Sequence, residues 1–102
     1  MSKHTPGPWA TDVFPLSVDI RSLSNPLIAV VQSRHCNSPE ELLENARLIA
    51  AAPEMLDALK KTSEFLHHMW CSANINEYDF EMVEETMLIN DAAIAKATGD
   101  QP

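Results

Sequence analysis

The spacing of apolar residues changes near residue 38, and this change restricts the fold more than any other feature of the sequence. Before it, apolar and polar residues alternate in segments 9–13 and 17–22, and an apolar, β-branched segment follows at 27–33, a pattern typical of short strands. After it, apolar residues recur every three or four positions, as in amphipathic helices. The order predicts an α+β fold, in which a short N-terminal antiparallel β-meander (residues 9–33, about three strands) is covered by two to three C-terminal helices.

The helical part has clear boundary signals. Ser38 is a predicted N-cap, followed by a proline at the first helical position and a glutamate three residues after the cap. Pro53 interrupts the apolar period, so residues 39–70 form either two helices or one helix kinked at this proline. An acidic C-terminal helix is expected over residues 78–97. The length of the chain predicts a single domain over residues 1–102.

The chain opens with a proline-rich hook, residues 1–8, that cannot be helical. In HTPGPW (His4–Trp9), both prolines lack a backbone N–H and bias the preceding residue toward extended geometry. Gly7 between them is expected to supply a turn. The hook would then place Trp9 between the first strand and the helix that contains NARLIAAAP, where the indole would bury on the order of 200 Å².

Negative charge is concentrated in the C-terminal third. The chain has a net charge of −8, and residues 62–102 hold one basic residue, Lys96, against eight acidic ones. A field of this sign repels nucleic-acid phosphates, so direct nucleic-acid binding is not expected, whereas another protein with a basic surface, including a nucleic-acid-binding surface, is a fitting partner. The other interpretation is a solvated helix face. The predicted partner-binding residues are Glu77, Asp79, Glu81, Glu84, Glu85 and Asp91.

The sequence does not predict an enzyme or a cofactor. Its two glycines cannot form a glycine-rich phosphate loop, and the paired carboxylates fall on predicted solvent faces. The histidines and cysteines at 35–36 and 67–71 match no standard zinc spacing, so no metal is expected. No apolar run is long enough to span a bilayer and no secretory signal is recognisable, which predicts a cytoplasmic protein without a membrane partner.

Two further candidate sites each have two interpretations. Where the hook meets the NARLIAAAP helix, an aromatic ring and a cation could bind a small molecule, or the polar residues there could face solvent. That candidate ligand site consists of His4, Trp9, Asn45 and Arg47. In the last helix, apolar residues and one asparagine form a coiled-coil-like seam, which packs within the monomer or pairs copies into a homo-oligomer. The seam consists of Phe80, Val83, Met87, Asn90 and Ile94.

Two motifs resemble a group of small proteins found in tailed bacteriophages and prophages. They are KHTPGPW at the start and NARLIAAAPEMLDALK at residues 45–60. In that group an HTPGPW-like opening precedes a short strand region and an ANARLIAAAPELLEAL-like helix. This chain has Met55 and Asp57 where the usual pattern has Leu and Glu. Residues 62–102 match no pattern of the group.

The resemblance implies a phage accessory protein that acts in the host cytoplasm and catalyses nothing. Combined with the acidic C-terminal third, it predicts an interaction protein that binds and inhibits a host factor. An anti-defence protein, either anti-CRISPR-like or mimicking nucleic acid, is the leading form of this hypothesis. The alternatives are a module that sequesters a small molecule such as a cyclic nucleotide, and an oligomeric structural accessory protein.

Overall fold

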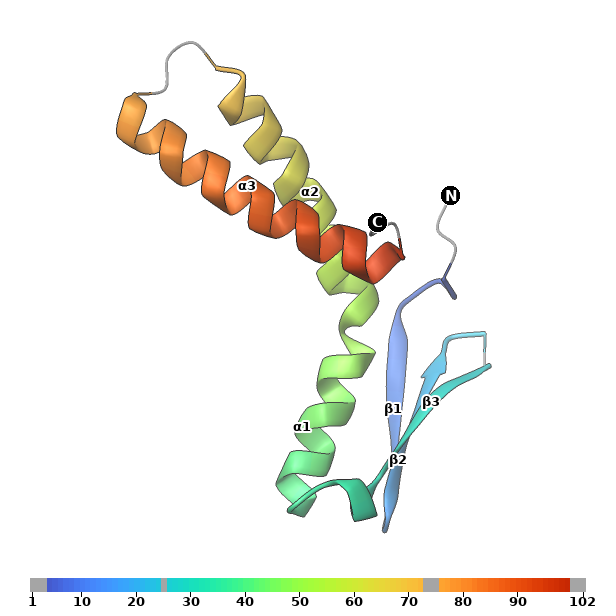
Figure 1. The fold of residues 1–102 in the computed structure, drawn as a ribbon. Helices are drawn as coiled ribbons and strands as arrows, with labels where there is room; N and C mark the ends of the chain where they lie inside the picture. Colours follow the sequence, from blue (N-terminus) through green and yellow to red (C-terminus); the bar gives the residue numbers. More distant parts are fainter. Residues whose placement is uncertain (1–3, 25, 73–75, 100–102) are drawn as a thin grey trace. The chain divides into compact units, whose positions relative to one another are not determined.

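The computed structural model describes residues 4–24, 26–72 and 76–99 (Figure 1). Within these residues the elements, in chain order, are β1 (Trp9–Phe14), β2 (Ser17–Ser22), β3 (Leu27–Gln32), the short 3₁₀ helix η1 (Ser33–His35), α1 (Pro39–Ala50), α2 (Ala52–Trp70) and α3 (Glu77–Thr98). The α+β class expected from the apolar spacing is confirmed. Contacts divide the chain into two compact units, Met1–Met55 and Leu56–Pro102.

The strands of the first unit form an antiparallel sheet in the order β1-β2-β3, which is the expected meander. β1 pairs with β2 in a regular register, whereas the register between β2 and β3 shifts between Ile20 and Arg21. Alternate residues of β2 are buried, namely Val18, Ile20 and Ser22. One face of the sheet therefore supplies the core of this unit.

Helix α1 covers that face. Leu42 and Ala46 of α1 are buried together with Val18 and Ile20 of β2 and form the core cluster. The start of the helix is the predicted one, because the Ser38 hydroxyl accepts a hydrogen bond from the backbone N–H of Glu41 at 3.1 Å. Local capping and the apolar period thus fix where α1 begins and which side faces the sheet.

The structure decides between one kinked helix and two helices in favour of two. α1 ends at Ala50, Ala51 lies in a turn, and α2 begins at Ala52. Pro53 occupies the first turn of α2, where the missing N–H removes no intrahelical hydrogen bond. Its side chain is buried.

In the second unit, α2 from Leu56 onward and α3 form a helical hairpin. Asn76 caps α3, because its side-chain oxygen accepts a hydrogen bond from the backbone N–H of Asp79 at 2.8 Å. Gly99 ends the helix with a left-handed backbone, φ 77°.

The predicted seam of α3 faces α2 of the same chain. The Asn90 side chain is 7% exposed and donates a hydrogen bond to the backbone carbonyl of Leu59 at 2.9 Å. Phe80 stacks on Trp70 with ring centroids 5.5 Å apart, and Met87 is buried. Asn90, the polar residue of the seam, therefore has its hydrogen-bond partner inside the hairpin.

Candidate functional site

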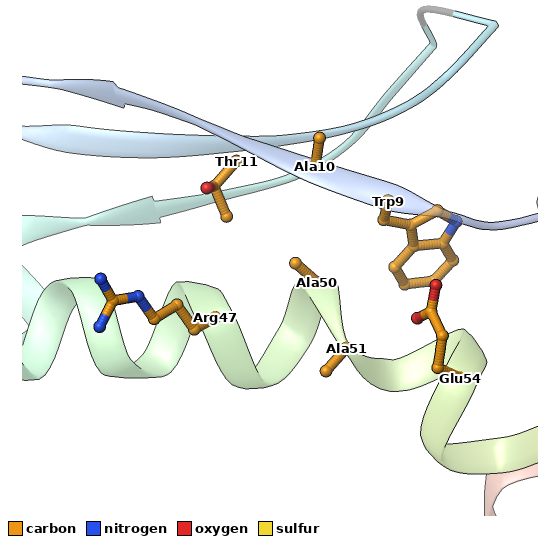
Figure 2. Close-up of a pocket in the computed structure, with 7 residues that line it drawn as sticks. All are labelled: Trp9, Ala10, Thr11, Arg47, Ala50, Ala51 and Glu54. Atoms are coloured by element: carbon orange, nitrogen blue, oxygen red, sulfur yellow. The ribbon is translucent and has the colours of Figure 1, made fainter. Parts of the chain in front are cut away.

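A shallow groove of about 500 Å³ lies on the first unit, between β1 and the α1–α2 junction (Figure 2). Figure 2 shows Trp9 and Thr11 pointing from β1 toward the helices, with Ala50 below them and Glu54 beside the indole. The complete lining is Trp9, Ala10, Thr11, Arg47, Ala50, Ala51 and Glu54. The short alanine side chains of the lining leave this space open, and the aromatic, cationic, anionic and hydroxyl groups at its margin offer contacts to a ligand.

The hook forms one end of this groove. The Trp9 indole N–H donates to the backbone carbonyl of Thr5 at 3.1 Å, and the His4 ring meets the indole edge-on with centroids 6.2 Å apart. Trp9 is half-buried and packs against the core cluster, so the expected placement of its ring between strand and helix is confirmed. His4 supports the indole and does not line the groove.

Gly7 has a packing role that the sequence did not indicate. A Cβ added at Gly7 would lie 2.9 Å from the Cβ of Pro53, which is closer than real Cβ atoms approach other atoms. Its φ is not in the left-handed region, unlike that of Gly99, so a positive φ is not what requires glycine here. The glycine instead lets the hook approach the start of α2.

Of the two predicted ligand residues of α1, only one lines the groove. Arg47 lines the groove, and its guanidinium lies 3.3 Å from the Glu44 carboxylate in an exposed ion pair. Asn45 is exposed and directs its amide toward the Cys36 sulfur at 3.6 Å. Of the four predicted residues, the groove brings together Trp9 and Arg47. Thr11 and Glu54 were not predicted, although the strand alternation places Thr11 on the same face as Trp9.

The predicted acidic residues of α3 differ in their surroundings. Glu77, Glu81 and Glu85 are exposed and four residues apart, so they share one side of the helix. We refer to these three residues as the acidic line. Glu84 is half-buried and borders it.

Asp79 and Asp91 take part in folding contacts. The Asp79 carboxylate accepts from the Asn76 amide at 2.8 Å within the cap of α3. The Asp91 carboxylate accepts from the Ser63 hydroxyl at 2.6 Å and lies 2.8 Å from Nε2 of His67. The Ser63 hydrogen bond, and after it the hydrogen bond and charge of His67, hold the pKa of Asp91 below its ordinary value. These contacts stabilise the hairpin and leave the acidic line as the free part of the predicted surface.

Within residues 4–24, 26–72 and 76–99, no helix has the length and apolar character needed to cross a bilayer. The same ranges hold no cluster of three histidine, cysteine, aspartate or glutamate side chains that could bind a metal ion.

These features define a small α+β protein with a shallow groove on its β-meander unit and an acidic line on its helical hairpin. The family model described as Salmonella phage P22 protein Y8K6 matches residues 1–101, and the chain belongs to this phage protein family. The phage origin expected from the resemblance is therefore confirmed. No curated protein and no solved structure matches the chain.

Proposed function

We propose that this phage protein is a non-enzymatic interaction protein that binds a basic, nucleic-acid-binding surface of a host protein through the acidic line of α3. The observation that carries the proposal is the line itself: three exposed carboxylates, Glu77, Glu81 and Glu85, on one side of a helix whose single basic residue is Lys96. Binding there would exclude nucleic acid and so inhibit the host protein. A host defence complex is the partner class that we favour.

The electrostatics of the acidic line support a role outside folding. Carboxylates four residues apart on a helix are separated by about 6 Å along its axis and repel one another, at about 0.2–0.5 kcal/mol per pair. Glu77 is favourable in the first turn of α3, but Glu81 and Glu85 lie beyond it. A basic partner would turn this repulsion into attraction and would accelerate association at low salt.

The test is retention of host proteins on the immobilised full chain. A variant with Glu77→Gln, Glu81→Gln and Glu85→Gln removes the acidic line, and the control variant Glu40→Gln, Glu44→Gln, Glu64→Gln removes three exposed charges from α1 and α2. Host lysate is passed over all three proteins, with and without added duplex DNA, and the retained proteins are quantified by mass spectrometry.

We expect wild type and the control to retain the same nucleic-acid-binding proteins, and duplex DNA to displace them. The variant without the acidic line should lose them, and retention should fall as salt rises, because exposed charges are screened over about 8 Å at physiological ionic strength. Equal retention by the variant, or retention that DNA does not displace, would refute the proposal.

The groove supports a second candidate, the binding of a small anionic molecule such as a cyclic nucleotide. Trp9 offers a ring for stacking and Arg47 a cation for phosphate, and both line the same groove. Glu54 on that lining opposes an anion, so the acidic line remains the favoured site. Calorimetry with a panel of cyclic nucleotides decides the question: binding that Arg47→Ala abolishes supports this candidate, and flat titrations eliminate it.

A further inference from the structure

Glu54 is a charged residue at the margin of the groove, and its side chain is exposed. Within the described part of the chain its carboxylate has no hydrogen bond or ion pair. A Cβ built on Gly7 would lie 3.6 Å from Oε1 of Glu54, so the carboxylate lies against the hook. Figure 2 shows it beside the Trp9 indole. An aromatic ring and a free carboxylate side by side are complementary to a cation.

Arg47 does not neutralise this carboxylate. In Figure 2 it lies at the opposite end of the groove from Glu54. Its guanidinium is 3.3 Å from the Glu44 carboxylate, so its charge already has a partner on α1. The end of the groove that contains Trp9 and Glu54 is therefore locally negative, and it favours a cationic group over an anion.

The groove also borders a free edge of the sheet, because β1 is an edge strand. Ser22 lies opposite Trp9 in the β1–β2 register, yet its backbone N–H donates to the Pro26 carbonyl at 3.2 Å. Trp9 and Ser22 are therefore a non-hydrogen-bonded pair, and the alternation of an antiparallel ladder puts Thr11 in such a pair as well. The backbone N–H and C=O groups of Trp9 and Thr11 thus point away from β2, toward the free edge.

We propose that the groove binds an extended peptide segment of a partner protein, with one lysine or arginine side chain between the Trp9 indole and the Glu54 carboxylate. The segment pairs with the free backbone groups of Trp9 and Thr11 and extends the sheet beyond β1. Backbone pairing supplies affinity for any extended sequence, and the basic side chain supplies selectivity. The alanines of the lining leave room for the aliphatic part of that side chain.

This peptide site is separate from the acidic line. Its residues belong to the first unit, whereas the acidic line belongs to α3 in the second unit. Substitutions at one site leave the other intact, so the two proposals can fail independently. The peptide and the small anion considered for the groove exclude each other, because both would occupy the face of the Trp9 indole. Binding of a cyclic nucleotide in the groove would therefore overturn the peptide proposal.

The first experiment is an NMR titration of the full, isotope-labelled chain with a blocked peptide of sequence threonine-valine-lysine-valine-threonine. We expect saturable shifts of the Trp9 indole N–H and of the Trp9 and Thr11 backbone amides. Two backbone hydrogen bonds and one charge-assisted contact predict a dissociation constant on the order of 1 mM. The same peptide with norleucine, an uncharged side chain, in place of lysine should bind about fivefold more weakly.

The second experiment repeats the titrations with two variants of the chain. Glu54→Gln should raise the dissociation constant of the lysine peptide about fivefold and leave that of the norleucine peptide unchanged. Glu40→Gln is the matched control, because Glu40 is also an exposed glutamate in the first turn of a helix but does not line the groove. This control should bind both peptides as wild type does. Circular dichroism checks that both variants keep their helices.

A third experiment tests the strand pairing with peptides that carry methyl groups on backbone nitrogens. Alternate N–H groups of a strand face its neighbour, so methylating the lysine nitrogen and methylating both valine nitrogens remove different sets. One of these two peptides should bind at least about tenfold more weakly than the other. The proposal would be overturned by the absence of saturable shifts, by shifts confined to residues outside the groove, by equal binding of the lysine and norleucine peptides, by an unaltered affinity in Glu54→Gln, or by two methylated peptides of equal affinity.

Discussion

Replacing Gly7 by alanine tests whether the hook and the start of α2 form one packed contact. The added Cβ would lie 2.9 Å from the Cβ of Pro53 and 3.3 Å from its Cγ. Pro53 is buried and its ring cannot rotate away, so the backbone of the hook has to move. Overpacking of this kind costs about 1–3 kcal/mol, and we expect a loss of about 2 kcal/mol because two rigid atoms are involved.

The assay is urea unfolding followed by Trp9 fluorescence, with Trp70 replaced by Phe so that one tryptophan reports on the first unit. The matched background is Pro53→Gly, which removes both atoms that the new Cβ would meet. In that background the additional cost of Gly7→Ala should fall below about 0.5 kcal/mol, which reveals the coupling between the two positions. An equal cost in both backgrounds would refute the packing argument.

Three other changes test the contacts described above. Trp9→Phe removes the indole N–H that donates to Thr5 and should cost at least about 0.5–1.5 kcal/mol in urea unfolding; an unchanged midpoint would contradict this. Asn90→Ala removes the donor to Leu59 and leaves a void in the hairpin, so it should cost about 1–3 kcal/mol by thermal circular dichroism, whereas a stability equal to wild type would not fit. Asp91→Asn should lower the melting temperature at neutral pH. Because the folded state holds the pKa of Asp91 below 3.8, its carboxylate stabilises the fold above that pH, and the difference from wild type should shrink as the pH falls below it; a difference that is constant with pH would contradict the assignment.

Local signals explain which parts of the fold were predictable. The Ser38 cap and the alternation in β2 act over a few residues, and the structure has a helix and a buried strand face where these patterns predict them. Pro53 was ambiguous because a proline fits both a kink and a helix start, and tertiary packing decides between them. The contact of Gly7 with Pro53 joins positions far apart in the sequence, so no local rule reveals it.

The residues of the candidate sites were likewise predictable only where local sequence signals identified them. Trp9 and Arg47 were predicted to lie together because a stacking ring and a cation met where hook and helix were expected to join, and the groove contains both. Asp91 was counted as a surface charge, since its partners are 24 and 28 residues away in the sequence. A carboxylate on a helix looks the same in sequence whether it faces solvent or a hydroxyl of the neighbouring helix.

The seam and the exposed apolar residues of α3 illustrate a further limit of periodicity. Spacings of three and four residues indicated the side of α3 that carries Asn90. In the structure this side faces α2, and Asn90 donates its hydrogen bond to Leu59 within the hairpin. Tyr78, Met82 and Ile89 also share one side, but Glu85 lies among them and conceals the pattern. The like charges of Glu81 and Glu85 repel one another, so the acidic line is not a stabilising feature of the hairpin. In the first unit, by contrast, Gly7 and Trp9 have packing roles that account for them. The carboxylates of the acidic line are not explained by packing in this way, which is why we place the proposed host-protein binding on α3.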